Sequence, residues 1–460
     1  MTRGSASDGA STASRAVLLA YSLGPVALLF IVPLFFYRMP MAVGLGAVLV
    51  HVGPSVVAKA LAVCAVWFGL AAGIVLWPFR GEVVPLQRSW PRPAVWHAFL
   101  ACSLLGAVVS LVHSLVRMPV GLEDTVHQLA FAPIVGVALG VYVLRDGAGR
   151  TNATVQRLLV WGLMTVDVAV ALGVPVLLSK VGPAAFGAIG VLYGLTAMRV
   201  PGRRILTVVL VVIPILVAAL PLKDVLRAEF YRHDAYHRVL AGQAATSSAS
   251  SSSGHVLTQE EELQQFDPWL MGLRFHRAVG PLLAAQYALA RAVNRINRLG
   301  DLAYVVETTP GTVSFSGYTT YRPIIGLLVP SALWKNKPQE NSGQFYGHRY
   351  GFLDPNDLTH AVNLPMVTEG WMAAGWAGVL LSAAAFGVLL RLIWRYWIGG
   401  HSDPGNVVIG MAVVGAAVAG ESNLTLVLGG IVHALLVYWV IDIAVRAWGR
   451  RMLAYSSGGY

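Results

Sequence analysis

The side chains best suited to chemistry lie in one late stretch of the chain, which ends at a carboxylate. Its cations and one neighbouring aromatic residue are Arg295, Arg298, Arg322, Trp334, Lys335, Lys337 and Arg349. His360, Asn363 and Glu369 follow them. Arginine and lysine suit a pyrophosphate group, because guanidinium contacts match phosphate oxygens in pairs. A histidine or a glutamate suits the role of general base on a sugar hydroxyl, because the pKa of either group can be tuned.

These residue types permit glycosyl transfer from a lipid-linked pyrophosphate. The cations would stabilise the leaving pyrophosphate as its charge develops. His360 or Glu369 would take the proton of the acceptor hydroxyl. The same cations also fit contacts with lipid headgroups, and the sequence favours neither use over the other. Both interpretations place this stretch at a membrane surface.

Other chemistries find no support in the sequence. It contains no glycine-rich loop that ends in Lys-Ser/Thr and no Gly-x-Ser-x-Gly motif. His348 and His360 lack a third ligand at zinc-like spacing, so we expect no metal and no cofactor. The formal net charge of +11 comes from arginines in short clusters between apolar runs. That pattern is typical of membrane topology signals, so we expect no nucleic-acid partner.

The elements that carry these residues are predicted to be transmembrane helices. Of the 460 residues, 56% are hydrophobic and 12% are charged, against about 25% charged in an average soluble domain. The apolar residues form runs of about 20, the length at which a helix crosses a bilayer. We therefore expect an all-α transmembrane bundle with about ten spans, at residues 16–36, 55–79, 94–116, 126–144, 158–179, 181–198, 205–222, 371–390, 407–420 and 424–447.

Arginine placement predicts the orientation of this bundle. With the N-terminus inside, the cytoplasmic segments hold sixteen basic and four acidic residues, as expected if Lys and Arg remain on that side. We expect a multi-pass protein of the cytoplasmic (inner) membrane with both termini in the cytoplasm. Residues 1–15 are predicted to be a disordered tail and residues 448–460 a second tail. The short apolar run 41–50 is either re-entrant or interfacial, and Asp442 and Arg446, four residues apart, predict an ion pair.

The spans divide the chain into two bundles around one large extracytoplasmic segment. The N-terminal bundle covers residues 16–222 with about seven spans, and the C-terminal bundle covers 370–447 with about three. The external segment, 223–369, carries 13 basic and 13 acidic residues. It includes a Ser-rich linker at 246–254. From Trp269 onward, apolar residues and arginines recur at helical spacing, which predicts a basic helix on the membrane surface.

The stretch from Arg322 to Gly378 resembles the bacterial O-antigen polymerases, also called oligosaccharide repeat-unit polymerases, and the related O-antigen ligases. Those proteins carry a Pro-Arg-x-x-Trp-x-x-Lys-Pro-like element, which is matched here by Pro330, Trp334, Lys337 and Pro338. Ser331 stands at the position where an arginine is usual. They also carry a His-Asn … Glu-x-Gly-x-x-Gly element, which is similar to His360, Asn363, Glu369, Gly375 and Gly378. Here His360 and Asn363 are not adjacent, and Glu369 lies further from Gly375 than in that element.

This resemblance implies a metal-independent glycosyltransferase with a GT-C-like helical bundle. It would transfer a growing glycan from an undecaprenyl-pyrophosphate carrier to a lipid-linked repeat unit, making O-antigen-like or exopolysaccharide chains at the outer membrane face. Its partners would be the lipid-linked oligosaccharide, membrane lipids, a chain-length regulator and a flippase. Arg298, Arg322 or Arg349 would hold the pyrophosphate, and His360 or Glu369 would engage the acceptor.

Two other functions fit the same sequence. Asp167 lies within the fifth predicted span, and Lys59 lies one turn into the second. Ionisable groups are costly in lipid and usually face a bundle interior or a cavity. These two would line a path if the chain were a transporter or a flippase of lipid-linked glycans, although Asp167 fits helix packing equally well. The other function is that of a non-catalytic membrane protein in envelope assembly.

Overall fold

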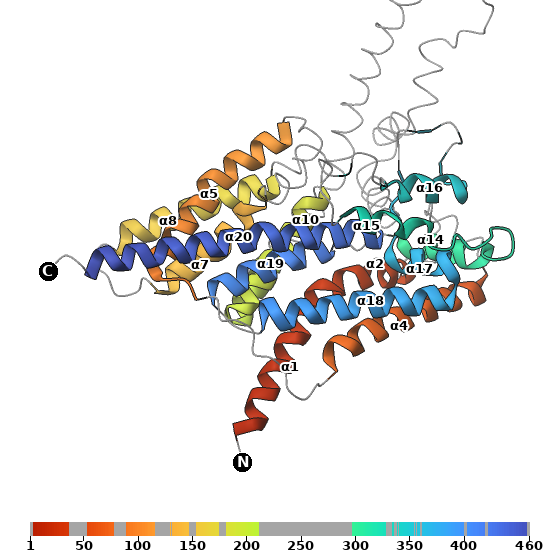
Figure 1. The fold of residues 1–460 in the computed structure, drawn as a ribbon, viewed down its shortest axis with the longest axis horizontal. Coiled ribbons are helices and arrows are strands. Elements are labelled where there is room, and N and C mark those ends of the chain that lie inside the picture. The colour runs from red at the N-terminus through yellow and green to blue at the C-terminus, as the bar shows by residue number, and fades with distance from the viewer. Residues whose placement is uncertain are drawn as a thin grey trace, which may run out of the picture.

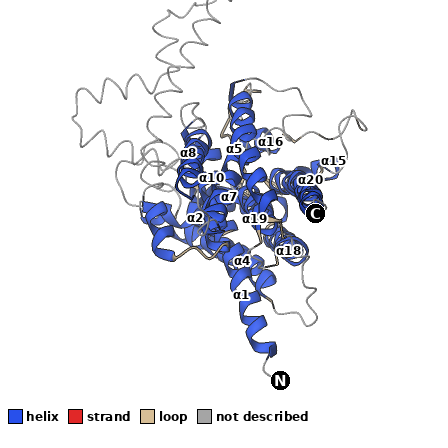
Figure 2. Ribbon diagram, turned by 90° about the vertical axis from the view of Figure 1, so that its left-hand side faces the viewer, coloured by secondary structure: helices blue, strands red, loops and turns tan. Residues whose placement is uncertain are grey.

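The chain is helical wherever its structure is described. A computed structural model describes residues 3–35, 53–77, 89–115, 129, 131–146, 153–173, 181–210, 297–327, 334, 338, 340–353, 355, 357–358, 361–399, 403–418 and 422–457. These residues form helices joined by turns, with no strand among them (Figure 1, Figure 2). The all-α prediction is confirmed for this part of the chain.

Among the described residues, five helices are long and apolar enough to cross a membrane. They are α4 (Pro54–Leu76), α5 (Arg92–Leu115), α8 (Ala153–Val168) with the π-helical turn η1 (Ala169–Gly173), α18 (Trp376–Ile393) with η3 (Trp394–Ile398), and α20 (Leu424–Ser457). A sixth would be the bent pair α1 (Arg3–Ser22) and α2 (Gly24–Phe35). Shorter apolar helices are α7 (Ala132–Asp146), α10 (Val181–Ala197) and α19 (Pro404–Val418). The described residues thus hold five or six candidate spans, and ten spans remain a prediction.

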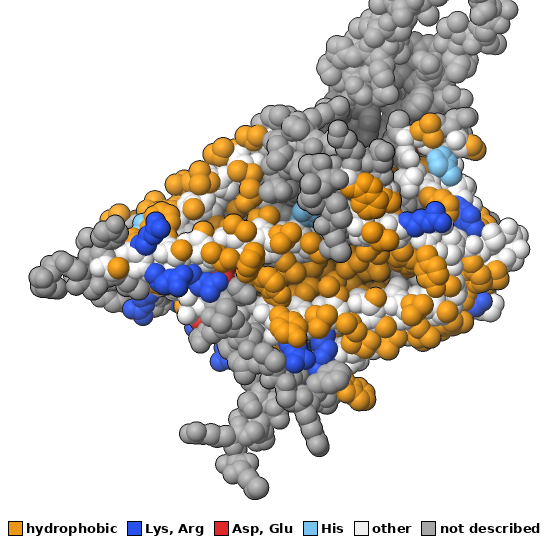
Figure 3. Space-filling model, in the orientation of Figure 1, with side chains coloured by type: hydrophobic (Ala, Val, Ile, Leu, Met, Phe, Trp, Pro, Cys, Tyr) orange, Lys and Arg blue, Asp and Glu red, His pale blue; other side chains and the backbone are white. Residues whose placement is uncertain are grey.

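The surface of these helices suits lipid better than water. In every candidate span, less than half of the residues in its most apolar window are buried inside the protein. Large apolar side chains are therefore exposed, among them Leu381 on α18 and Leu436 on α20. Figure 3 shows a broad apolar surface across the helices, with Lys and Arg gathered toward its margins. Such a surface would be unfavourable in water but matches a hydrocarbon layer.

Several predicted boundaries need correction. Residues 3–15 are not a disordered tail, because α1 begins at Arg3. No proline interrupts this segment, which permits the helix to extend back from the apolar run. The break between α1 and α2, with its 52° bend, precedes Pro25, which lacks an N–H for the helical ladder. Likewise, α20 continues to Ser457 instead of ending in a tail at residue 448.

At one end of the bundle, arginines bind the terminal carbonyl groups of neighbouring helices. Arg391 of α18 donates from Nη1 to the carbonyl oxygens of Ile74 (2.7 Å) and Val75 (3.2 Å) at the end of α4. Arg15 of α1 donates to the carbonyl oxygen of Trp77, at 3.1 Å. These carbonyls have no partner within α4, and a cation also complements the negative end of the helix dipole. The helix ends predicted to be cytoplasmic therefore lie together, whichever compartment they face.

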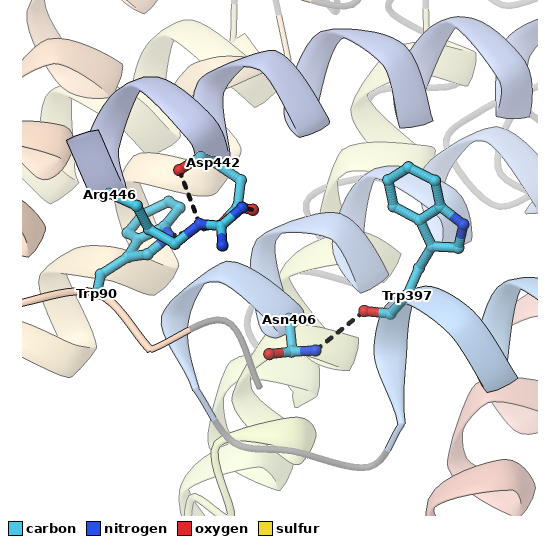
Figure 4. A network of polar contacts seen from close by, with 5 residues as sticks. All are labelled: Trp90, Trp397, Asn406, Asp442 and Arg446. Atoms are coloured by element: carbon cyan, nitrogen blue, oxygen red, sulfur yellow. Dashed lines mark hydrogen bonds and ion pairs between the residues drawn. The ribbon is translucent and has the colours of Figure 1, made fainter. Parts of the chain in front are cut away.

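The same end carries a second polar network (Figure 4). Arg446 Nη2 lies 2.6 Å from Asp442 Oδ2, which confirms the predicted ion pair. The indole N–H of Trp90 donates to Asp442 Oδ1 at 2.9 Å, joining the segment before α5 to α20. Asn406 Nδ2 donates to the carbonyl oxygen of Trp397 at 3.0 Å, tying α19 to η3. These contacts satisfy buried polar groups and fix α5, α18, α19 and α20 at this end.

A sharp turn at Gly375 separates α18 from the short helix α17 (Met366–Ala374). Gly375 has a φ of +58°, which an L side chain rarely adopts. The two helices pack so closely that a Cβ on Gly378 would lie 2.0 Å from the carbonyl oxygen of Gly370. The span predicted to begin at Trp371 therefore begins at Trp376, because the turn interrupts it. The predicted domain boundary at residues 369–370 also falls inside α17.

Gly378→Ala should disrupt the packing of α17 on α18. Alanine would normally stabilise a helix by about 1 kcal/mol relative to glycine, but here its Cβ meets backbone atoms that cannot move aside. We expect a several-fold lower yield of monodisperse protein in detergent and a lower melting temperature. Gly73→Ala in α4, where nothing lies within 4 Å of the added Cβ, is the matched control. Equal behaviour of the two variants would contradict the close packing.

Candidate functional site

The start of α20 is the meeting point of three separate segments. The backbone N–H of Leu424 donates to Glu369 Oε2 of α17 at 2.8 Å. The hydroxyl of Thr425 donates to the carbonyl oxygen of Thr320, at 3.2 Å, in the 3₁₀ turn η2 (Thr319–Tyr321). Asn423 Oδ1 accepts the N–H of Leu426 at 2.9 Å and so caps α20. Figure 1 shows α14, α15, α16 and α17 gathered at this end, away from the C-terminus.

Glu369 is fully buried at this meeting point, and one of its oxygens accepts the N–H of Leu424. Within the described part of the chain, Oε1 has no hydrogen-bond partner. The pKa of Glu369 is raised to about 8, mainly by burial and to a lesser degree by the nearby charge of Glu340. The N–H of Leu424 and the hydroxyl of Thr320 act against this rise. A carboxyl with one oxygen free and a pKa near neutrality can accept or release a proton at physiological pH.

Glu340 is a second carboxyl of this site, and sequence reasoning did not single it out. Its Oε1 accepts from Asn423 Nδ2 at 2.7 Å and from the N–H of Ser342 at 2.9 Å. Glu340 thereby links the cap of α20 to the first turn of α16 (Ser342–Arg349). Because it sits in a short polar stretch without helical periodicity, only the tertiary structure reveals this role.

Two of the predicted phosphate-binding arginines lie near this meeting point, Arg322 exposed and Arg349 half-buried. Arg322 directly follows η2 and is exposed. Arg349 ends α16, where its Nη2 donates to the carbonyl oxygen (2.5 Å) and hydroxyl oxygen (3.0 Å) of Ser314. The loop that contains Ser314 is anchored to α17, because the N–H of Ser316 donates to the carbonyl oxygen of Met372 at 2.9 Å. Arg322 thus adjoins a turn that contacts α17 and α20, and Arg349 binds a loop that is anchored to α17.

Arg298 is placed differently from these two. It opens α14 (Arg298–Thr308), which Asn297 caps by accepting the N–H of Gly300 at 3.0 Å. Arg298 is buried, and its Nη1 lies 3.1 Å from Asp301 Oδ2. Burial raises the pKa of Asp301, and the Arg298 guanidinium opposes that rise. This internal ion pair gives Arg298 a structural role.

Of the remaining predicted site residues, two lie within the described part of the chain. Asn363 is half-buried in the segment that leads into α17, and Trp334 is half-buried. Arg295, Lys335, Lys337 and His360 lie outside the described residues, as does the basic helix predicted from Trp269, apart from its last arginine. Their assignment to the site stays a prediction.

Lys59, which the sequence placed inside a predicted span, lies against α17. Its Nζ is 4.9 Å from the ring centroid of Trp371. A cation over an indole face is attracted by the ring quadrupole. Lys59 is exposed, so it adds a positive charge near the end of α4 that contacts the candidate site.

Comparisons with protein-family models, curated proteins and solved structures give no match for this chain. Among the described residues, no three His, Cys, Asp or Glu side chains are grouped as a metal ion would require. The chemistry that the described site offers is that of a buried carboxyl beside surface cations.

Asp167 forms a separate polar site within the candidate spans. Ser103 Oγ of α5 donates to Asp167 Oδ2 of α8 at 2.7 Å. Oδ1 has no partner among the described residues, and the carboxyl is fully buried. A Cβ on Gly136 of α7 would lie 2.5 Å from Oδ2, so three helices pack closely around this group. Asp167 thus lies inside the bundle, where both packing and transport interpretations place it.

Glu369 should make the protein less stable as the pH rises. Because its pKa is about 8 in the folded protein and about 4.3 when unfolded, the folded state binds more protons between these values. The stability that the neutral Glu369 carboxyl contributes is therefore fully present below about pH 4.3 and is lost as the pH rises through about 8. We expect the melting temperature of the wild type to fall between pH 6 and pH 9, and that of Glu369→Gln to fall less.

Glu307→Gln, which changes an exposed carboxyl on α14, controls for a general effect of removing charge. It should retain the pH dependence of the wild type. Identical melting profiles for Glu369→Gln and the wild type would show that Glu369 does not titrate in this range.

Proposed function

We propose that this chain is a membrane glycosyltransferase that polymerises lipid-linked oligosaccharide repeat units at the outer face of the cytoplasmic membrane. The observation that supports it most is the buried carboxyl of Glu369, which keeps one oxygen unbonded at the start of α20. Arg322 directly follows η2, and Arg349 binds the Ser314 loop, which is anchored to α17. A general base beside phosphate-binding cations is the combination that transfer from a sugar pyrophosphate requires.

In the proposed reaction, Glu369 Oε1 accepts the proton of the acceptor hydroxyl. The acceptor oxygen then bonds to the anomeric carbon of the donor glycan, as the bond from that carbon to the pyrophosphate oxygen breaks. The electron pair of that bond leaves with the prenyl pyrophosphate, and Arg322 and Arg349 stabilise its charge. A base works best when its pKa lies near the working pH, and the pKa of Glu369, about 8, meets this condition.

The orientation in the membrane belongs to the same proposal. The arginine-rich helix ends that bind carbonyl groups would face the cytoplasm, and the start of α20 would face outward. His360 is the alternative base, and Lys335, Lys337, Arg295 and Trp334 would extend the contact with the pyrophosphate or with lipid headgroups. The substrate carrier would be undecaprenyl pyrophosphate, and a flippase and a chain-length regulator would act with the enzyme.

Glu369→Gln should abolish long polymer. Glutamine keeps the size of the side chain and can still accept the N–H of Leu424, but it cannot take a proton. Removal of a general base lowers the rate roughly 100- to 10,000-fold. We expect polysaccharide from cells that carry this variant, or Arg322→Ala, to stop at one or a few repeat units on a gel.

Arg450→Ala, an exposed arginine at the opposite end of α20, is the control and should give wild-type chain lengths. Membrane levels of every variant must match. Full-length polymer from Glu369→Gln at equal expression would remove Glu369 from the reaction.

The buried carboxyl of Asp167, whose Oδ1 has no partner among the described residues, favours a second candidate function, the transport of a lipid-linked glycan. Under the glycosyltransferase proposal, Asp167 serves helix packing. Asp167→Asn, which can still accept the hydrogen bond from Ser103, should then retain at least half of the wild-type polymer. Loss of polymer from folded Asp167→Asn, together with full activity of Glu369→Gln, would favour transport.

A further inference from the structure

Two buried polar atoms beside Glu369 Oε1 share its lack of a partner. They are the hydroxyl oxygens of Thr320 and Tyr321, and neither forms a hydrogen bond within the described part of the chain. Thr320 is 2% exposed, and Glu369 is 0% exposed. Most buried polar groups in proteins are hydrogen-bonded, and each exception requires an explanation. Three such atoms at one place indicate a ligand.

The segments that carry these three atoms pack against one another. Thr320 and Tyr321 belong to η2, which packs against both α17 and α20. The Thr320 hydroxyl approaches Glu369 closely enough to lower the pKa of the carboxyl, but it lies outside the geometry of a formed hydrogen bond. Burial raises the pKa of Tyr321, and the charge of Glu369 raises it further, so this phenol also lies near the carboxyl. The bond from Thr425 to the carbonyl oxygen of Thr320 keeps η2 in place.

The donor and acceptor types of this set define its ligand. A carboxyl oxygen accepts hydrogen bonds, whereas a threonine or tyrosine hydroxyl both donates and accepts. Neighbouring sugar hydroxyls offer the same mixture. A pyrophosphate only accepts hydrogen bonds, and its charge would be repelled by Glu369 and Glu340. The set therefore complements a neutral polyhydroxylated group and not the pyrophosphate.

We infer that Glu369, Thr320 and Tyr321 form the subsite for the acceptor sugar, separate from the arginines that bind pyrophosphate. This inference rests on the proposed function and adds the ligand class of the site. Thr320 and Tyr321 would hold the sugar ring so that one hydroxyl points at Glu369 Oε1. The Thr319-Thr-Tyr-Arg-Pro segment would thus contribute to both halves of the reaction, through its hydroxyls and through Arg322.

Thr320→Val and Tyr321→Phe test this subsite, since each removes one hydroxyl and little else. Loss of a buried hydroxyl that has no partner should leave the melting temperature unchanged or raise it. The KM for the acceptor should rise at least tenfold in each variant. Thr425→Val is the matched control, because it removes a hydroxyl that is bonded, and its melting temperature should fall.

A binding measurement separates this inference from the proposed function. Purified protein is melted with a polyprenyl-pyrophosphate-linked disaccharide and with the same polyprenyl pyrophosphate lacking sugar. The wild type should be stabilised more by the sugar-bearing probe, and Thr320→Val and Tyr321→Phe should lose that extra stabilisation. Sugar-dependent stabilisation without any glycosyl transfer would support the subsite while overturning the polymerase.

Three results would overturn the subsite. One is equal stabilisation of the wild type by both probes. Another is an unchanged response to the sugar-bearing probe in both hydroxyl variants. The third is a marked fall in the melting temperature of Thr320→Val and Tyr321→Phe, which would show that the protein itself uses these hydroxyls.

Discussion

A helix that begins inside a protein needs acceptors for its first N–H groups, and at α20 one acceptor is the buried carboxyl of Glu369. The positive end of the helix dipole favours the carboxylate, whereas burial and Glu340 favour the neutral acid. These opposing influences hold the carboxyl near its titration midpoint at physiological pH. The position of α17 depends on this contact and on the turn at Gly375, which brings Glu369 beside α20.

The unpaired backbone groups of helix termini are bound by side chains of opposite charge at the two ends of the bundle. At one end, the guanidinium groups of Arg15 and Arg391 bind carbonyl oxygens. At the other, Glu369 accepts a terminal N–H, and Glu340 binds the residue that caps α20. Such groups must be satisfied by protein where lipid excludes water. Cationic side chains at one end and carboxyls at the other thus satisfy groups that the helices leave unpaired at their termini.

The sequence predicts the parts of this structure that depend on local patterns. Apolar runs gave α4, α5 and α20 to within a few residues at their starts, because a bilayer span needs a long apolar stretch. The spacing of Asp442 and Arg446 predicted their ion pair for the same local reason. The break at Gly375 escaped detection, because glycine is tolerated within apolar helices and only the close packing of Gly370 and Gly378 reveals the turn.

The site depends on contacts that no local pattern contains. Glu369 was recognised as a candidate, but its partner Leu424 lies 55 residues away. Glu340 and Asn423 are separated by 83 residues, and Thr320 and Thr425 by 105. For Arg298 the prediction was wrong for a different reason. Its place in a basic helical pattern suggested a surface cation, but the nearby Asp301 pairs with it inside the protein.

An experimental structure with a lipid-linked oligosaccharide bound would test the central claim most directly. The account predicts a sugar hydroxyl within hydrogen-bond distance of Glu369 Oε1, with the pyrophosphate on the side of Arg322. A substrate seated against Asp167 within the spans, with Glu369 still buried and out of contact, would contradict it.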